Sequence, residues 1–267
     1  MARPALVTLT TDFGLDDHFV GTMKGVMLNI NPSLSFVDIC HRIQSYDLLD
    51  GALSIALSYT YFPPETIHLV IVDPGVGSAR RPIVAASPRY KFVAPDNGVL
   101  SLIYEREANL EVRHATSERY FLHPVSNTFH GRDIFAPLAG WLSAGTELDQ
   151  LGGVITDYIK LSVPKPERAS EGQVRGVILK VDKFGNLITN VTPEDVPELF
   201  TGSSPPFRIT VQEYTVTRIY SSYSMGKASE LFAILGSSGY LEVCRNLGSA
   251  ADALQATRGT EIKIKVG

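Results

Sequence analysis

An aspartate and an arginine flank a glycine-containing turn, and their types could hold and polarise a water molecule. The apolar residues 69–72 lead to Asp73, and a Pro-Gly-Val-Gly turn at 74–77 then prevents a strand or helix from continuing. Arg80 follows across a turn tight enough to fold it back toward Asp73. Ligands of open α/β sheets bind at the carboxyl ends of strands, which makes Asp73 a candidate site residue. A structural aspartate with a surface ion pair is the alternative.

Two further polar residues stand where strands or helices are expected to end or begin. Residues 5–11 are rich in β-formers and end at Asp12, so a second strand end carries an acid. His130 lies between an aromatic residue and a glycine, ahead of an expected helix whose first N–H groups could face an anion or water. The other histidines are isolated in the sequence, which is typical of structural or exposed histidines.

A metal site is a possible use of the acids near the N-terminus. Asp12, Asp16, Asp17 and His18 have side chains that could bind a divalent cation. Asp16 and Asp17 also suit the positive end of a helix dipole, and we favour this interpretation. The sequence lacks a P-loop, a GxSxG elbow, an HExxH motif and a zinc-type cluster, so no metal ligand is predicted.

The last third of the chain contains two polar turns. Asp182, Phe184 and Asn186 surround a glycine and could bind an ammonium group and the edge of an adenine ring; an ordinary Asx β-turn is the alternative. Residues 236–240, Gly-Ser-Ser-Gly-Tyr, offer hydroxyl and N–H groups suited to a carboxylate, or form a simple hairpin.

Alternating strand and helix patterns must position the first set of residues. Strands are expected at 5–11, 34–40 and 67–73, with helices at 19–30 and 47–61 between them. This order predicts an α/β domain with a mixed or parallel sheet flanked by helices. Further strands are expected at 82–86, 91–94 and 111–114, and further helices at 99–106 and 134–143.

A proline- and charge-rich segment at 164–172 is typical of a linker, which gives an α/β domain at 1–163 and a second domain at 173–267. Short alternating strands predict a smaller all-β domain, a barrel or a sandwich. They are expected at 174–181, 186–191, 206–220, 230–235, 240–244 and 260–266, with brief helices near Glu194 and Ala250.

Composition limits the partners of this 267-residue chain. Its net charge is -4 and its basic residues form no stripe, so neither nucleic acid nor a membrane surface is expected as a partner. No apolar run approaches the roughly 20 residues of a spanning helix, and no signal peptide is recognisable. Cys40 and Cys244 are predicted to be reduced core residues. We therefore expect a cytoplasmic protein that acts on a small molecule.

In order and along nearly the whole chain, the polar motifs resemble those of the S-adenosylmethionine hydroxide adenosyltransferases. This family hydrolyses S-adenosylmethionine to adenosine and methionine and is related to the fluorinating and chlorinating enzymes that use the same substrate. The motifs are Thr-Asp-Phe-Gly at 11–14 with Asp17, Met-Lys-Gly at 23–25, Val-Asp-Pro-Gly-Val-Gly at 72–77, Ala-Pro-Asp-Asn-Gly at 94–98, Phe-His-Gly-Arg-Asp at 129–133, the segment 182–190, and Gly-Ser-Ser-Gly-Tyr-Leu at 236–241.

The resemblance implies roles for eleven residues. They are a water-orienting triad of Asp73, Arg80 and His130, a ribose-binding carboxylate at Asp12, an aromatic wall at Tyr46, methionine contacts from Asp182 and Ser237, and adenine contacts from Phe184, Asn186, Tyr223 and Arg245. It also implies a reaction without metal or organic cofactor. A homotrimer is implied as well, with each active site between one subunit's first domain and a neighbour's second.

Departures from the halogenating relatives bear on the nucleophile. Those enzymes have tyrosine where this chain has Asp73 and His130, and serine where it has Gly131, which argues against halide. They have arginine in place of Ser238, so recognition of the substrate's carboxylate differs here. Three alternatives stay open: a protein that binds S-adenosylmethionine or adenosine without turnover, a halide-using transferase, and a metal-dependent hydrolase built on Asp12 and its neighbouring acids.

Overall fold

The computed structural model describes residues 4–169, 172–201 and 205–267. By contacts between Cα atoms the chain divides into two compact units, Met1–Ser162 and Val163–Gly267. Each unit has its own apolar core. Within the described residues, no helix combines the length and the apolar character that crossing a membrane requires.

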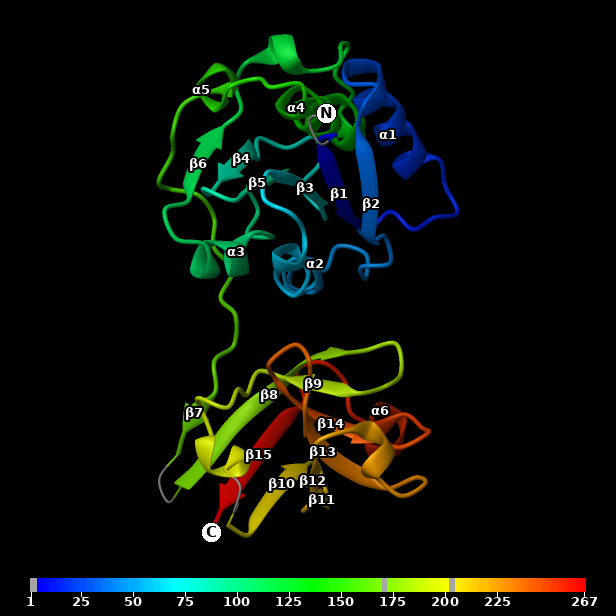
Figure 1. Cartoon of the computed structure of the whole chain (residues 1–267), viewed down its shortest axis with the longest axis vertical. Helices are drawn as coiled ribbons and strands as arrows, with labels where there is room; N and C mark the ends of the chain where they lie inside the picture. The colour runs from blue at the N-terminus through cyan, green and yellow to red at the C-terminus, as the bar shows by residue number, and fades with distance from the viewer. Residues whose placement is uncertain (1–3, 170–171, 202–204) are drawn as a thin grey trace. The chain divides into compact units, whose positions relative to one another are not determined.

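The first unit is built on a six-stranded mixed sheet in the order β2-β1-β3-β5-β4-β6 (Figure 1). β2, β1, β3 and β5 run parallel, whereas β4 is antiparallel to both of its neighbours. The strand bounds are β1 Leu6–Thr11, β2 Ser35–Cys40, β3 Thr66–Ile71, β4 Pro82–Ala86, β5 Tyr90–Pro95 and β6 Glu111–His114. The predicted α/β domain with a mixed sheet is confirmed.

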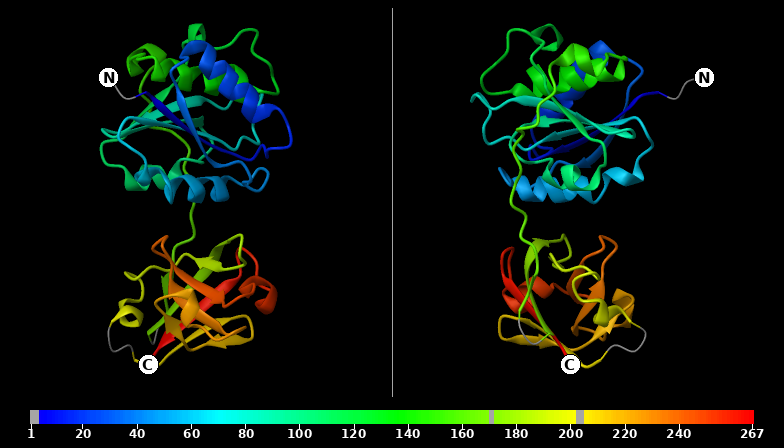
Figure 2. Two further views of the ribbon diagram at one scale, coloured as in Figure 1. Left: turned by 45° about the vertical axis from the view of Figure 1, so that its right-hand side comes forward. Right: turned by 90° about the vertical axis from the view of Figure 1, so that its left-hand side faces the viewer.

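Helices cover both faces of this sheet. α1 (Phe19–Ile30) packs beside α4 (Ala136–Ser143) on one face, and α2 (Leu48–Ala56) lies beside α3 (Ser101–Arg106) on the other (Figure 2). The short α5 (Leu148–Leu151) contacts β6. Coverage on both sides explains why β3 is buried along its whole length, including the polar residues Thr66 and His68.

The second unit is a curled, strand-rich sheet in the order β11-β10-β15-β8-β9-β14-β13-β12, with β7 paired to β8 (Figure 1). Its elements are β7 Glu167–Arg168, β8 Gln173–Val181, β9 Leu187–Thr189, β10 Phe207–Val211, β11 Tyr214–Val216, β12 Ile219–Tyr220, β13 Leu231–Leu235, β14 Leu241–Arg245, α6 Ala250–Leu254 and β15 Glu261–Val266. The all-β prediction for this part of the chain is confirmed. β7 falls inside the segment that the composition marks as a linker.

Candidate active site

Two of the expected acids emerge at one edge of the first sheet. β1 and β3 are parallel neighbours with Thr11 opposite Ile71, so Asp12 and Asp73 both follow strand ends at the carboxyl edge. Burial raises the pKa of Asp12, and the negative charge of nearby Asp73 acts in the same direction against a backbone hydrogen bond from Tyr46. The parallel pairing of β1 and β3 therefore places the two carboxyls at the same edge of the sheet.

Asp73 and Arg80 form a buried ion pair. Arg80 Nε donates to Asp73 Oδ1 at 2.9 Å and to Oδ2 at 3.0 Å, and Arg80 Nη2 also donates to Oδ2. Only 5% of the Asp73 side chain and 8% of the Arg80 side chain are exposed. A guanidinium that contacts both carboxylate oxygens fixes the carboxylate's orientation as well as its charge. The surface ion pair that the spacing left open is therefore wrong.

Glycine makes the turn between these two residues possible. Gly77 has φ +78, and a Cβ there would lie 2.4 Å from the backbone oxygen of Asn127. A side chain at this position would therefore meet both backbone strain and a collision. Asn127 lies three residues before His130 in the sequence, so the close contact also ties the turn to the loop that carries the histidine.

His130 completes the cluster through one ring nitrogen. Arg80 Nη2 lies 2.8 Å from His130 Nδ1. A guanidinium can only donate, so Nδ1 accepts, and the neutral ring carries its proton on Nε2. Burial and the positive charge of Arg80 lower the pKa of His130, against the opposing charges of Asp73 and Asp133 and a hydrogen bond to the Ser126 backbone. The ring is therefore neutral at neutral pH, with Nε2–H as a hydrogen-bond donor.

A π-helical turn, Gly131–Phe135, follows His130 and leads into α4. Such turns occur frequently at functional sites. Asp133, which was not predicted as a site residue, is fully buried; it accepts the Ser126 N–H at 2.8 Å and two hydrogen bonds from Arg132. It thereby fixes the loop ahead of His130. Its place beside Arg132 in the motif was the available signal.

Tyr46 contacts Asp12 through its backbone. The Tyr46 N–H donates to Asp12 Oδ2 at 2.9 Å, and Tyr46 adopts φ +68. The residue as a whole is 72% exposed. Tyr46 thus contacts Asp12 through its peptide N–H, and its side chain remains accessible to a ligand.

In the second unit, five of the six expected residues line one cavity of about 630 Å³. They are Asp182, Phe184, Asn186, Tyr223 and Arg245; Ser237 is exposed and does not line it. Residues 246–249, which the sequence interpretation missed, form another part of the wall. Their signal was a polar, glycine-containing turn directly after a strand.

The turn that begins at Asp182 is both a structural turn and a wall of this cavity. Asp182 Oδ1 accepts the N–H groups of Phe184 and Asn186, each at 2.8 Å, and Oδ2 accepts the Asn186 side-chain amide at 2.9 Å. Gly185 has φ +83, and a Cβ at this position would collide with Ser249. The Asx-turn interpretation is therefore correct, and the same turn leaves the Phe184 ring 74% exposed.

Glu242 on β14 is a buried acid that the sequence interpretation missed. Tyr223 donates to Glu242 Oε2 at 3.0 Å, and Ser238 Oγ lies 3.4 Å from Oε1. Burial raises the pKa of Glu242. A Cβ at Gly236 would lie 1.8 Å from Oε1, so the expected carboxylate-binding turn closes directly over this side chain. The signal was an acid between apolar residues, Leu241 before it and Val243 after it.

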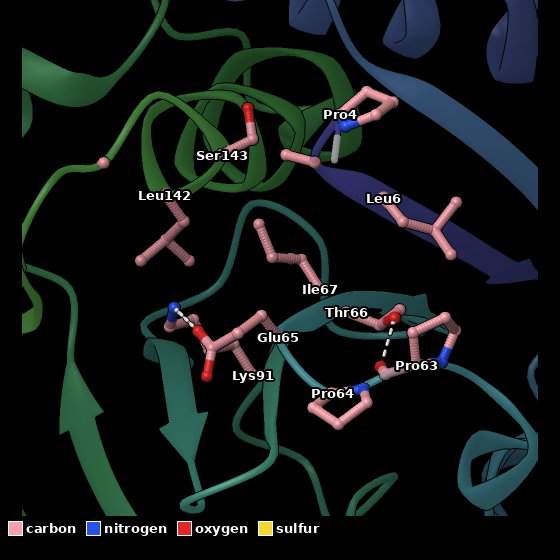
Figure 3. Close-up of a pocket in the computed structure, with 12 residues that line it drawn as sticks. Pro4, Leu6, Pro63, Pro64, Glu65, Thr66, Ile67, Lys91, Leu142 and Ser143 are labelled. Atoms are coloured by element: carbon pink, nitrogen blue, oxygen red, sulfur yellow. Dashed lines mark hydrogen bonds and ion pairs between the residues drawn. The ribbon is translucent and has the colours of Figure 1, made fainter. Parts of the chain in front are cut away.

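A separate cavity of about 380 Å³ opens at the opposite edge of the first sheet, beside Leu6 and Thr66 at the amino ends of β1 and β3 (Figure 3). A 2.9 Å ion pair between Lys91 and Glu65 lies in it. None of the expected site residues lines this cavity.

The acidic side chains considered for a metal site do not converge on a common point among the described residues. Asp16 and Asp17 are exposed in the segment before α1, whose N-cap is His18. Within 4–169, 172–201 and 205–267, no three side chains of His, Cys, Asp or Glu are arranged to hold a metal ion.

Comparison with known proteins gives matches along the whole chain. Residues 7–152 match the family model described as the SAM hydroxide adenosyltransferase N-terminal domain, and residues 176–263 match that of the C-terminal domain. A protein of Salinispora tropica named (R)-S-adenosyl-L-methionine hydrolase is 32% identical, with 100% of both chains covered. A fluorinase of Nocardia brasiliensis is 26% identical over 99% of this chain and 98% of its own.

A solved structure shows the same fold. An uncharacterized conserved protein from Thermotoga maritima superposes with a TM-score of 0.90 at 35% identity, covering 97% of this chain and 99% of that one. The two family models match more than half of the sequence, in the order of the two compact units. The chain therefore belongs to the SAM hydroxide adenosyltransferase family.

Proposed function

We propose that this protein hydrolyses S-adenosyl-L-methionine to adenosine and L-methionine, by in-line attack of water on the ribose 5′ carbon. The observation that carries the proposal is the buried cluster of Asp73, Arg80 and His130 at the carboxyl edge of the first sheet. It occurs in a chain that is 32% identical, over its full length, to a protein named (R)-S-adenosyl-L-methionine hydrolase.

The leaving group needs little help in this reaction, because methionine departs from a sulfonium as a neutral thioether. Water is the difficult partner, since it must be aligned and must lose a proton as the C–O bond forms. His130 Nε2–H would donate to the water oxygen, and Asp73 would accept the proton, because Nδ1 is already occupied by Arg80. Positioned acid–base assistance of this kind contributes about 10²–10⁴-fold to the rate.

The charge change favours a dry site. Hydroxide character on the water meets a positive sulfonium, so charge disappears in the transition state and a water-excluded pocket favours it over the ground state. Aromatic faces also attract the sulfonium.

The proposed binding roles are Asp12 for the ribose, Tyr46 as an aromatic wall, Asp182 and Ser237 for the methionine end, and Phe184, Asn186, Tyr223 and Arg245 for the adenine. The reaction is proposed without metal or organic cofactor.

One assay decides the proposal. Purified protein is incubated with the substrate, and adenosine is followed by chromatography against a heat-killed control. We expect catalytic formation of adenosine that a chelator does not suppress. Tight stoichiometric binding with no product would favour a sensing protein instead. A halogenated nucleoside at high chloride or fluoride would favour the halide-using alternative.

We propose a homotrimer in which neighbouring subunits share each active site, as the family resemblance implies. Light scattering gives the mass, and mixing two inactive variants tests the sharing. Asp73→Asn alters the first unit and Phe184→Ala the second. Co-refolded together, they should recover about one quarter of the wild-type activity, because each half of a site has an even chance of being intact. No recovery would assign each site to one subunit.

A cytoplasmic location is proposed in line with the unpaired Cys40 and Cys244.

A further inference from the structure

A buried histidine holds the loop of Asp12 from both sides. His41 follows β2 and is 4% exposed. Its Nδ1 lies 2.8 Å from Thr11 Oγ1, and its backbone oxygen accepts the Gly14 N–H at 2.7 Å. These two contacts bracket Asp12 in the chain.

The Thr11 hydroxyl reaches the same loop a second time. Thr11 is fully buried, and its Oγ1 accepts the Phe13 N–H at 3.3 Å. One threonine oxygen therefore joins the histidine ring to the peptide that directly follows Asp12. Loss of this hydroxyl would leave both the ring nitrogen and the Phe13 N–H without their partner.

The second ring nitrogen of His41, Nε2, lies beside the ion pair of Asp38 and Lys24. His41 Nε2 lies 3.0 Å from Asp38 Oδ1, and Asp38 Oδ2 lies 2.6 Å from Lys24 Nζ on α1. Burial acts against ionisation of Asp38, but hydrogen bonds from Lys24 and His41 lower its pKa overall. The His41 ring therefore presents Nε2 to the Asp38 carboxylate and Nδ1 to the Thr11 hydroxyl.

The segment that starts at His41 also holds the carboxyl group of Asp12. Five residues on, the Tyr46 N–H donates to Asp12 Oδ2. Residues 41–46 thus contact residues 11–14 at the backbone, at the threonine hydroxyl and at the aspartate itself. Three hydrogen-bond contacts from this one segment therefore hold the Asp12 side chain in position.

We propose that His41 is a positioning residue that sets the Asp12 carboxylate for the ribose hydroxyls of the substrate. This inference rests on the proposed function, and specifically on the ribose role of Asp12. A histidine that only stabilised the core would change folding without changing which ligand hydroxyls the protein distinguishes. Selectivity for those hydroxyls therefore separates the two roles.

The test compares adenosine with 2′,3′-dideoxyadenosine by calorimetry in the full-length protein. Hydrogen bonds from hydroxyls to a carboxylate predict that the wild type prefers adenosine by on the order of 10- to 100-fold. Both His41→Leu and Thr11→Val should reduce this ratio by about fivefold, with little change in dideoxyadenosine affinity. The double variant should reduce it no further, because both changes cut the same connection.

His68 supplies a matched control. It is also fully buried, and its Nδ1 lies 2.7 Å from the hydroxyl of Thr8, on the same strand as Thr11 but away from the Asp12 loop. His68→Leu should keep the wild-type ratio. Thr11→Val nearly preserves the side-chain shape, so the test stands even where His41→Leu folds poorly.

Each remaining outcome overturns the inference. An unchanged ratio in Thr11→Val and His41→Leu, or an equal loss of both ligands, would give His41 a purely structural role. A wild type that does not distinguish the two ligands would remove the ribose role of Asp12. The adenosine-forming assay, run separately on the wild type, shows whether the proposed function stands in either case.

Discussion

The proposed reaction depends on Asp73, whose carboxylate is oriented by two nitrogens of Arg80. Asp73→Asn keeps the shape but removes the proton acceptor. We expect kcat to fall by about 10²–10⁴-fold while adenosine still binds. Single-turnover rates and calorimetry measure the two effects. Asp157→Asn is the control, since that exposed carboxylate also pairs with an arginine, Arg81, but lies outside the site. An unchanged kcat in Asp73→Asn would refute the proposed role.

The tautomer of His130 predicts an acid limb in the pH profile. Burial and Arg80 lower the pKa of His130 from 6.5, so the ring stays neutral until the pH falls below that value. A second proton would then occupy Nδ1, the nitrogen that accepts from Arg80, and kcat/KM should fall. The unfolded chain takes up this proton at higher pH than the native one, so stability declines in the same direction. A rate profile from pH 8 to 4.5 measures the limb.

His130→Asn tests the assignment of that limb. The asparagine oxygen can still accept from Arg80, and the side chain does not titrate. The variant should lose activity yet keep a flat profile across the range in which the wild type declines. An acid limb of the same position in both proteins would assign it to another group.

Sequence spacing predicted that Arg80 folds back toward Asp73, but it did not predict how the other polar residues contact each other. Asp73 and Arg80 could be joined because a turn of known composition lies between them. The use of His130 Nδ1, the anchoring by Asp133 and the burial of Glu242 could not be predicted, since each depends on segments distant in sequence. Ser237, for which the resemblance implies a methionine contact together with Asp182, does not line the cavity of Asp182, because a hairpin sequence does not specify which hydroxyl faces inward.

At the scale of elements, the turn 74–77 links the ion pair to the loop of His130. Gly77→Ala would combine the left-handed φ of +78 with a Cβ 2.4 Å from the Asn127 oxygen. Gly259→Ala has a similar φ of +83, but its Cβ would meet nothing within 4 Å, so it carries the backbone cost alone, about 1–2 kcal/mol. We expect Gly77→Ala to be the less stable variant in urea and the one that loses kcat. Equal effects of the two changes would show that the contact with Asn127 affects neither stability nor kcat.

The end of β1 was predicted correctly at Thr11, where the run of β-forming residues stops at Asp12. The helix expected at 47–61 instead ends at Ala56, and Ser58 Oγ donates to the backbone oxygen of Ser54 there. Such side-chain bonds compete with helix continuation. The strand expected at 206–220 is three strands, because Gln212 adopts φ +53 in a turn that contains no glycine.

At the scale of the molecule, two apolar cores support two sets of polar residues. The first core lies beneath the carboxyl edge that carries Asp12 and Asp73, and the second lies within the curled sheet whose cavity holds Phe184. Fold class followed from sequence because alternation of strands and helices reports which faces are buried. The pairing of the strands did not, since it depends on contacts far apart in the chain.

Global stability should depend on pH through His68. This fully buried residue of β3 lies among the rings of Tyr59, Tyr90 and Phe92, and burial lowers its pKa to about 3. The unfolded chain binds the proton near pH 6.5 and the native one near 3, so stability is lost as the pH falls between these values, by up to about 1.4 kcal/mol per pH unit. Urea unfolding at pH 7, 6, 5 and 4 measures the slope. His68→Leu should reduce it by that amount, and an identical slope in the variant would assign the acid sensitivity to other groups.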